Sequence, residues 1–208
     1  MGNLVYSVGL TGGIGCGKTT VLEVFKSLGI PCFNSDDEAK KYYDDATFCQ
    51  QVAEWFGHHV LRLDGSVDRK AIAAVVFNDP CELHWLNSQL HPRVMADFHE
   101  WKIRCNDNIP YVILESAILY ESHLDKEVDF VVDVYLEKEE RLRRLELRDH
   151  VSRDLLEARM ANQMNEEEKR DRADFVIHNY EGNPRREQVL AIHRQLLGKR
   201  EAISPERS

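Results

Sequence analysis

The sequence lacks the features of secreted, membrane-spanning and disulfide-stabilised proteins. No basic segment precedes an apolar stretch near residue 1, and the longest apolar runs are too short to cross a bilayer. The five cysteines are odd in number and far apart, and no C-x-x-C pair occurs among them. This pattern argues against a disulfide framework and against a zinc site. We therefore expect a cytoplasmic protein with reduced thiols and no membrane partner.

An excess of positive charge is also missing. The chain has 27 Lys and Arg residues against 36 Asp and Glu residues, a net charge of −9. Such an acidic chain is a poor general binder of polyanions, so we expect no nucleic-acid partner, and any anionic ligand must be held by local donors. The length of 208 residues, with 43% hydrophobic residues, is that of one globular domain, or of a core with one or two small inserts.

Short apolar runs alternate with amphipathic segments along most of the chain. The apolar runs predict strands at residues 4–10, 30–33, 111–114, 130–136 and 175–177. Periodic apolar positions predict helices at residues 17–28 and 184–197. Another helix is expected from Asp36 onward, because Ser35 and Asp36 both suit an N-cap. Strands that alternate with helices indicate an α/β fold with a parallel sheet covered on both faces.

Residues 46–106 contain no strong strand pattern and are predicted to be helical. A turn at residues 64–65 precedes one helix, which runs to Phe77. An apolar stripe of helical spacing then extends over residues 83–105 and is interrupted by Pro92. Because proline suits the first turn of a helix, we expect one helix to end just before it and another to begin there.

The spacing of glycines, lysine and threonine in one segment indicates a phosphate-binding site. Residues 12–19 read Gly-Gly-Ile-Gly-Cys-Gly-Lys-Thr, which fits the pattern G-x-x-x-x-G-K-[ST] in full between a predicted strand and a predicted helix. The glycines let backbone N–H groups turn toward phosphate oxygens, and the helix adds its N-terminal dipole. Lys18 can reach the β- and γ-phosphates, and the Thr19 hydroxyl can bind Mg²⁺. Cys16 is interpreted as a small filler of the loop.

Other features narrow the class of nucleotide-binding protein. The guanine-reading N-K-x-D and the D-x-x-G switch of regulatory GTPases are absent. Residues 137–172 are rich in charges of both signs, which is typical of solvated helical faces. A small chain with such a segment late in its sequence favours a small-molecule kinase with a lid.

The ordered series of motifs resembles the dephospho-coenzyme A kinase family over nearly the whole chain. The family opening L-T-G-G-I-G-x-G-K-[ST] is matched by residues 10–19, and its late Ala-Asp, Val-Ile, Asn and Gly pattern by residues 173–182. The sequence departs from the family at Asn34, which replaces the first acid of a D-x-D-type segment, and at residues 117–121, where a proline is lost. Further matches are Asp64-Gly65, Arg69 and Phe77, Leu90-His91-Pro92, residues 144–149 and residues 159–163.

The resemblance implies a P-loop NTPase three-layer α/β fold with a five-stranded, mostly parallel sheet. It implies one domain with a helical substrate-binding insert at about 46–106, a lid at about 141–172, and a P-loop core at about 1–45, 107–140 and 173–200. The implied reaction is ATP-dependent phosphorylation of the ribose 3′-hydroxyl of dephospho-CoA, the last step of coenzyme A synthesis. ATP and Mg²⁺ are the implied cofactors, and dephospho-CoA is the implied partner.

The expected catalytic residues are Asp36 and Lys18. Asp36 follows the second strand, at the sheet edge where ligands bind in α/β folds, so its carboxylate can accept the acceptor hydroxyl's proton. The alternative role for Asp36 is that of a helix N-cap. ATP contacts are expected from Gly12, Gly13, Ile14, Gly15, Cys16, Gly17, Lys18, Thr19, Thr20, Arg148 and Asn179.

Substrate contacts are expected from Arg69, His91 and Glu121, and the only protein ligand expected for the metal is Thr19. His91 could instead cap its helix, and Asn179 could be a turn residue. Glu115 closes an apolar strand without an assigned role. Two other functions stay open: another small-molecule or nucleoside monophosphate kinase, and a nucleotide-binding switch that transfers no phosphate.

Overall fold

The structure is a computed structural model that describes residues 5–76, 79–105 and 108–203. Phe77 and several bounds of the expected segments, at residues 1, 4, 106 and 107, lie outside the described residues. The chain divides into two compact units, one of residues 34–103 and one of the remaining residues. We call these the helical unit and the sheet unit. No described helix is both long and apolar enough to span a bilayer.

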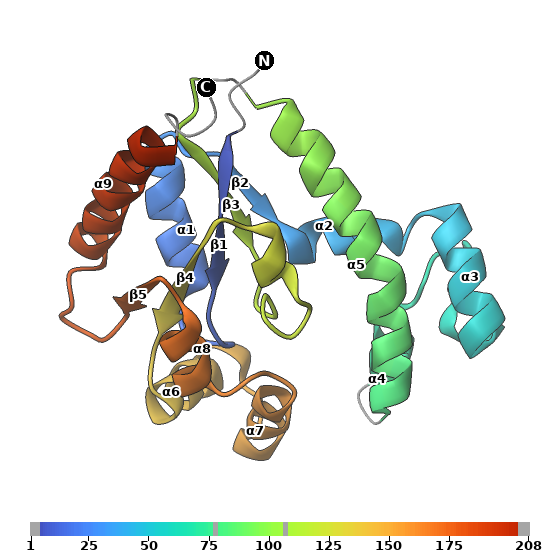
Figure 1. The fold of residues 1–208 in the computed structure, drawn as a ribbon. Coiled ribbons are helices and arrows are strands. Elements are labelled where there is room, and N and C mark those ends of the chain that lie inside the picture. Colours follow the sequence, from blue (N-terminus) through green and yellow to red (C-terminus); the bar gives the residue numbers. More distant parts are fainter. Residues whose placement is uncertain (1–4, 77–78, 106–107, 204–208) are drawn as a thin grey trace. The chain divides into compact units, whose positions relative to one another are not determined.

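The sheet unit is organised around one five-stranded sheet (Figure 1). Its strands are β1 (Tyr6–Thr11), β2 (Cys32–Asn34), β3 (Tyr111–Glu115), β4 (Phe130–Tyr135) and β5 (Phe175–His178), in the order β2-β3-β1-β4-β5. β1 pairs in parallel with both β3 and β4, and β4 pairs in parallel with β5. The predicted strands and the α/β class are confirmed.

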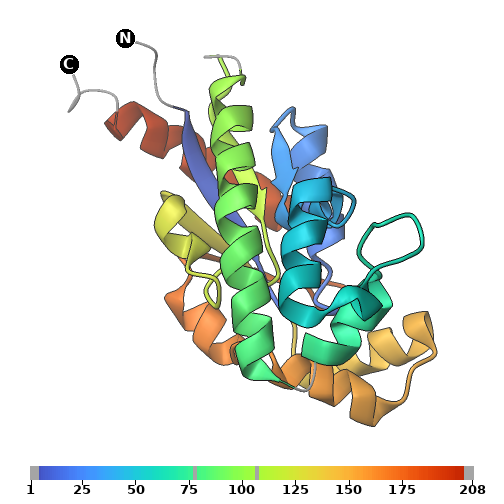
Figure 2. The ribbon, with the colours of Figure 1, turned by 90° about the vertical axis from the view of Figure 1, so that its right-hand side faces the viewer.

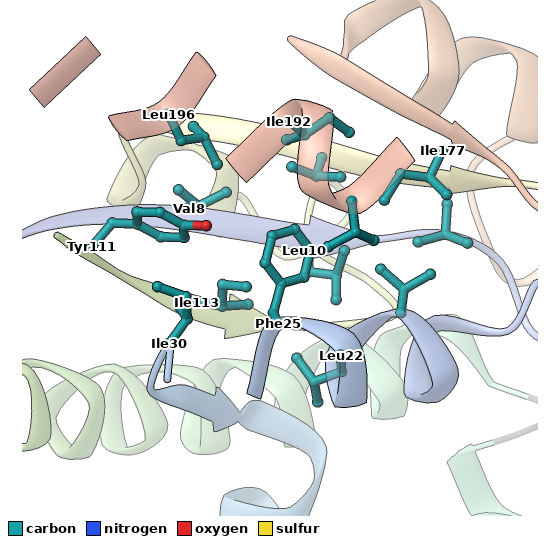
Figure 3. Packing of buried hydrophobic residues seen from close by; sticks show 14 of the residues in the cluster. Val8, Leu10, Leu22, Phe25, Ile30, Tyr111, Ile113, Ile177, Ile192 and Leu196 are labelled. Carbon is teal, nitrogen blue, oxygen red and sulfur yellow. The ribbon is translucent and has the colours of Figure 1, made fainter. Parts of the chain in front are cut away.

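Both faces of this sheet are covered. Side chains of β1 alternate between the two faces, and all of them are buried. On one face, Val8 and Leu10 of β1 meet α1 (Lys18–Ser27) and α9 (Arg185–Ile203), as Figure 3 shows with Phe25 and Ile192. On the other face, Gly9 lies under the Leu119 side chain, and α8 (Glu166–Arg172) packs against β4. The central strand is therefore held between two layers.

The predicted lid segment folds into three helices of the sheet unit: α6 (Lys138–Asp149), α7 (Arg153–Ala161) and α8. Leu142, Leu145, Leu156 and Met160 form their shared apolar cluster, and Ile14 packs against it. The charged residues were interpreted as solvated faces, and most are exposed. Three of them are buried instead, namely Arg141, Glu166 and Lys169.

The helical unit contains α2 (Ser35–Tyr42), α3 (Ala46–Phe56), the short 3₁₀ helix η1 (His58–Val60), α4 (Arg69–Val76) and α5 (Pro80–Ile103). Its apolar core includes Phe48, Val52, Ile72 and Leu86. The expected turn at residues 64–65 is present, with Gly65 at a φ of 85°. Asp68 then caps α4, since its carboxylate accepts the N–H groups of the first turn.

The expected helix break at Pro92 is wrong. α5 is one helix of 24 residues with Pro92 in its interior. Figure 2 shows it as one continuous green helix. Proline removes one backbone hydrogen bond, but Leu90 and Val94 on either side of it are buried. Together with Leu86 and Phe98 they continue one apolar stripe at four-residue spacing. Tertiary packing along this stripe therefore outweighs the local cost of the proline.

The N-cap expected at Ser35 or Asp36 is also placed wrongly. The residue that caps α2 is Asn34, whose side-chain Oδ1 accepts the Asp37 N–H at 2.8 Å. Asp36 lies in the first helical turn with an exposed side chain. Asn34, which departs from the family pattern, therefore has a structural task that asparagine performs as well as aspartate.

Replacing Asn34 should test this cap directly. Asn34→Ala removes the acceptor of the Asp37 N–H and should lower the free energy of unfolding by about 1 kcal/mol. Asn34→Asp keeps an oxygen at the same place and should leave the stability close to that of the unaltered chain. Urea unfolding of the three proteins provides the measurement. Equal stabilities of the Ala and Asp variants would contradict the assignment.

Candidate active site

The phosphate-binding loop joins β1 to α1, where the sequence predicts it. Gly15 and Gly17 have φ angles of 85° and 93°, a left-handed backbone that favours glycine. Cys16 is fully buried in the main core, and burial raises the pKa of its thiol. This agrees with its interpretation as a filler. The Thr19 side chain is exposed in the first turn of α1.

Parallel pairing brings the carboxyl ends of four strands to one edge of the sheet, beside this loop. Leu10 is in register with Glu115 of β3, and Thr11 with Asp133 of β4. Asn179 follows β5 directly. Ligands of α/β proteins bind outside this edge, so these polar residues are candidates for the site.

Asn179 is held against the loop. Its side chain is buried, and its Nδ2 donates to the Cys16 carbonyl at 2.6 Å. A Cβ at Gly17 would collide with this amide, so the glycine is required by the contact. Arg144 of α6 donates from Nη2 to the Asn179 carbonyl at 3.0 Å. Asn179 therefore fixes the loop backbone, and its contact with ATP stays a prediction.

Lys18 is folded back onto its own loop. Its Nζ donates to the Gly12 carbonyl at 2.7 Å. The amine thus lies beside the Gly12–Gly13 peptide, and this end of the loop is the one that the lysine reaches. Contact with β- and γ-phosphates is a prediction for the nucleotide-bound state.

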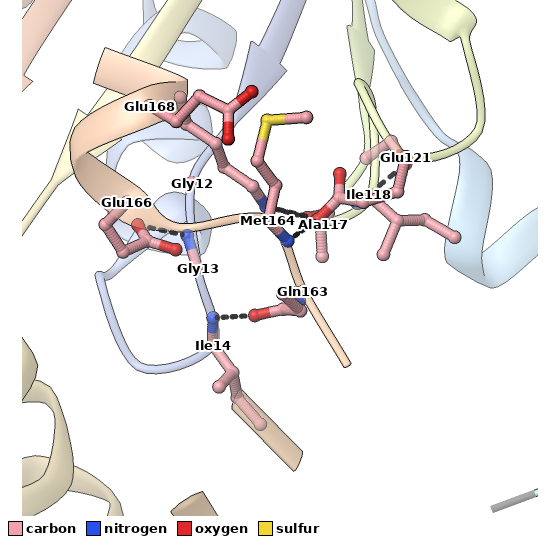
Figure 4. Close-up of polar contacts among 12 residues, drawn as sticks. Gly12, Gly13, Ile14, Ala117, Ile118, Glu121, Gln163, Met164, Glu166 and Glu168 are labelled. Atoms are coloured by element: carbon pink, nitrogen blue, oxygen red, sulfur yellow. Dashed lines mark hydrogen bonds and ion pairs between the residues drawn. The ribbon is translucent and has the colours of Figure 1, made fainter. Parts of the chain in front are cut away.

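Two side chains of the predicted lid accept backbone N–H groups of the loop, as Figure 4 shows. Glu166 Oε2 accepts the Gly13 N–H at 2.9 Å, and Gln163 Oε1 accepts the Ile14 N–H at 3.0 Å. Glu166 Oε1 lies 3.1 Å from Arg141 Nη1 in a buried ion pair. Loop N–H groups suited to phosphate oxygens are thus occupied by oxygens of the protein itself.

Glu121 connects the segment after β3 to α8. Its Oε1 accepts from the Met164 N–H and from Lys169 Nζ, both at 2.8 Å, and Figure 4 includes the first of these contacts. Lys169 is fully buried and also donates to the Ala117 carbonyl at 2.9 Å. Glu121 therefore anchors the predicted lid, and substrate contact by it stays a prediction.

The remaining predicted residues are not gathered around the loop by any described contact. Arg148 is 65% exposed and forms a two-point pair with its neighbour Asp149. Asp36, Arg69 and His91 belong to the helical unit. Arg69 donates to a backbone carbonyl of α2 at 3.0 Å, and burial lowers the pKa of His91, which keeps its imidazole neutral near pH 7.

Asp133 is the least satisfied acid of the sheet edge. It is fully buried, and among the described residues neither carboxylate oxygen has a hydrogen-bond partner. Burial raises its pKa to about 7, and the negative charge of Glu166 adds to this. Lys169, Lys18 and Arg141 oppose the shift with their positive charges.

The residues beside the loop fit a Mg²⁺ ion only in part. Within the described ranges, no three His, Cys, Asp or Glu side chains form a metal-binding group. Mg²⁺ in phosphoryl-transfer sites is bound largely by phosphates and waters, so one exposed hydroxyl such as that of Thr19 fits it. The residues present therefore suit a metal that arrives with a nucleotide.

Comparisons with known proteins decide the family. The sequence profile of dephospho-CoA kinases matches residues 6–184. The chain belongs to the dephospho-CoA kinase family. A dephospho-CoA kinase of Idiomarina loihiensis is 35% identical over 93% of this chain and 96% of its own length. One of Legionella pneumophila is 36% identical, with the same coverage.

Solved structures agree with this assignment. A protein of Thermus thermophilus is 32% identical, with a TM-score of 0.82 over 93% of this chain and 99% of that one. Dephospho-CoA kinase of Campylobacter jejuni is 26% identical, with a TM-score of 0.68 over 93% and 98%. The expected P-loop kinase fold and the kinase class are confirmed.

Sequence reasoning missed three residues that touch or approach the loop of this dephospho-CoA kinase family member: Arg141, Glu166 and Asp133. Gln163 was included only as the end of a matched segment. Arg141 and Glu166 lie among many charges of both signs, and only their burial distinguishes them. Asp133 does carry a signal, because an acid inside an apolar strand is unusual.

The raised pKa of Asp133 predicts a pH-dependent stability. Because its folded pKa of about 7 lies above the ordinary 3.8, protonation stabilises the fold. This stabilisation is complete below about pH 4 and is lost as the pH rises through about 7. Asp133→Asn should therefore raise the melting temperature of the ligand-free protein at pH 8 and much less at pH 5. A difference that is the same at both pH values would contradict the shift.

Proposed function

We propose that this protein transfers the γ-phosphoryl group of ATP to the ribose 3′-hydroxyl of dephospho-CoA. In this reaction, the hydroxyl oxygen forms a bond to the γ-phosphorus while the bond from phosphorus to the β,γ-bridging oxygen breaks. The products are coenzyme A and ADP. The observation that carries the proposal is a complete phosphate-binding loop between β1 and α1 in a chain of the dephospho-CoA kinase family.

Binding of ATP is assigned to residues 12–20, with Arg148 and Asn179 as further contacts. An acidic protein can bind a triphosphate here because inward N–H groups and the Lys18 amine neutralise it locally. Mg²⁺, when bound, neutralises charge on the β- and γ-phosphates, and Thr19 would be its protein ligand. Residues 141–172 act as a lid that excludes water from the reacting phosphate.

Recognition of the acceptor is assigned to residues 46–106, with Arg69 and His91 as contacts and Glu121 as a third. Asp36 is the base that takes the proton from the 3′-hydroxyl. Its carboxylate is exposed in the first turn of α2, and Asn34 rather than Asp36 carries the capping hydrogen bond. We place the reaction in the cytoplasm.

Product analysis tests the function. With ATP, Mg²⁺ and dephospho-CoA, the protein should form coenzyme A, seen by mass spectrometry as one added phosphoryl group. ADP should form only when the acceptor is present. Lys18→Ala should fold normally and lose nearly all product, since it removes a charge that stabilises the transition state. Phosphorylation of another acceptor in a panel, or ADP formation independent of any acceptor, would contradict the proposal.

Replacing Asp36 tests its role as the base. Asp36→Asn should lower kcat by about 10²–10⁴-fold, the usual contribution of general-base catalysis. kcat/KM should fall with it, the pattern of an interaction made in the transition state. The melting temperature should stay close to that of the unaltered protein, because Asn34 still caps α2. A stable variant with an unchanged rate would remove Asp36 from the mechanism.

A further inference from the structure

The Arg141–Glu166 ion pair lies directly on the phosphate-binding loop. Arg141 comes from α6 and Glu166 is the first residue of α8, and their side chains are 5% and 6% exposed. Glu166 uses one carboxylate oxygen for Arg141 and the other for the Gly13 N–H. The carboxylate is thus an anion of the protein in a place suited to a phosphate oxygen.

The ion pair leaves no space for a side chain at Gly13. A Cβ at this position would collide with both Arg141 Nη1 and Glu166 Oε1. The same end of the loop carries the Gly12 carbonyl that holds Lys18 Nζ. Because that amine reaches the β- and γ-phosphates in P-loop proteins, the ion pair occupies the end of the loop that would receive them.

Two features allow the pair to open. A cavity of about 460 Å³ lies among α6, α7 and the start of α8, and Arg141, Met160, Gln163 and Glu166 are among its lining residues. It gives the Glu166 side chain space to leave the loop. Arg141 Nε is buried and has no hydrogen-bond partner among the described residues, so the guanidinium has an unused donor.

We propose that Arg141 binds the β- or γ-phosphate of ATP, and that the Glu166 carboxylate occupies the position of this phosphate until the nucleotide binds. In the exchange, a phosphate oxygen accepts the Gly13 N–H and the Arg141 donors, and Glu166 moves into the cavity. The pairing of Arg141 changes from carboxylate to phosphate, two acceptors that match the same planar guanidinium. This inference rests on the use of ATP in the proposed function.

A purely structural ion pair would behave differently. If Arg141 served only to neutralise Glu166, its positive charge would have no task once Glu166 is neutral. If Arg141 binds phosphate, its removal weakens nucleotide binding even when Glu166 is already neutral. The two roles therefore separate in the Glu166→Gln background. In that background, no buried carboxylate is left unpaired when Arg141 is replaced, so the double variant avoids the largest folding penalty.

The experiment measures the Kd of a non-hydrolysable ATP analogue with Mg²⁺ by calorimetry, in the absence of an acceptor. Glu166→Gln alone should tighten binding several-fold, because the competing charge is gone. Adding Arg141→Gln to it should weaken binding by about 10- to 100-fold, the value of a charge-assisted hydrogen bond. Melting temperatures check that each ligand-free variant is folded, and Glu166→Gln with Arg141→Lys, which keeps the charge, should recover part of the loss.

Arg143→Gln is the matched control. Arg143 lies on the same helix, is 56% exposed and pairs with Glu140, so the substitution removes an equal charge away from the loop. Its Kd should stay within about twofold of the unaltered chain, as expected for an exposed charge.

The proposal fails on either of two results. Equal Kd values for Glu166→Gln with and without Arg141→Gln would overturn the assignment of Arg141. An unchanged Kd in Glu166→Gln would overturn the exchange. Failure of the unaltered chain to bind the analogue would overturn both this inference and ATP use, whereas binding without acceptor phosphorylation would overturn the proposed function alone.

Discussion

The backbone N–H groups of the phosphate-binding loop are the constraint on which the rest of the site depends. Backbone polar groups withdrawn from water need partners, and a glycine-rich loop of this kind presents several N–H donors together. In the structure, Glu166 and Gln163 supply the acceptors for the N–H groups of Gly13 and Ile14. The loop thereby determines where the segment from α6 to α8 rests, and Ile14 adds an apolar contact with the same segment.

Charge explains why so many buried ionisable groups surround this loop. The chain is acidic overall, so a triphosphate can be held only where positive groups are concentrated. Three cations lie near the loop, and each has an oxygen acceptor of the protein: Lys18, Arg141 and Lys169. The Asp133 carboxylate has no hydrogen-bond partner among the described residues, and its burial and the charge of Glu166 raise its pKa to about 7 against the effect of these cations. These charges thus connect the loop to the segment from α6 to α8.

Local sequence patterns were enough to predict the sheet, the loop and the family, because each depends on a short run of residues. The apolar runs of β1, β3, β4 and β5 and the glycine pattern before Lys18 are of this kind. The apolar stripe around Pro92 was visible in the sequence, but it was misread as two helices because the sequence does not show that its burial outweighs one lost hydrogen bond. The Arg141–Glu166 ion pair was not predicted for a related reason. Nothing in the sequence of a mixed-charge segment distinguishes a buried ion pair from exposed ones. The role of Asp36 as the general base remains a prediction from the sequence.

The central claim is that a phosphate of ATP replaces Glu166 on the Gly13 N–H. The most direct test compares the ¹H–¹⁵N amide resonance of Gly13 in the unaltered chain and in Glu166→Gln. Without nucleotide the two resonances should differ, because the acceptor of this N–H changes from a carboxylate to an amide. With the ATP analogue and Mg²⁺ bound, they should coincide, because phosphate is then the acceptor in both proteins. A difference that persists at saturating nucleotide would contradict the account.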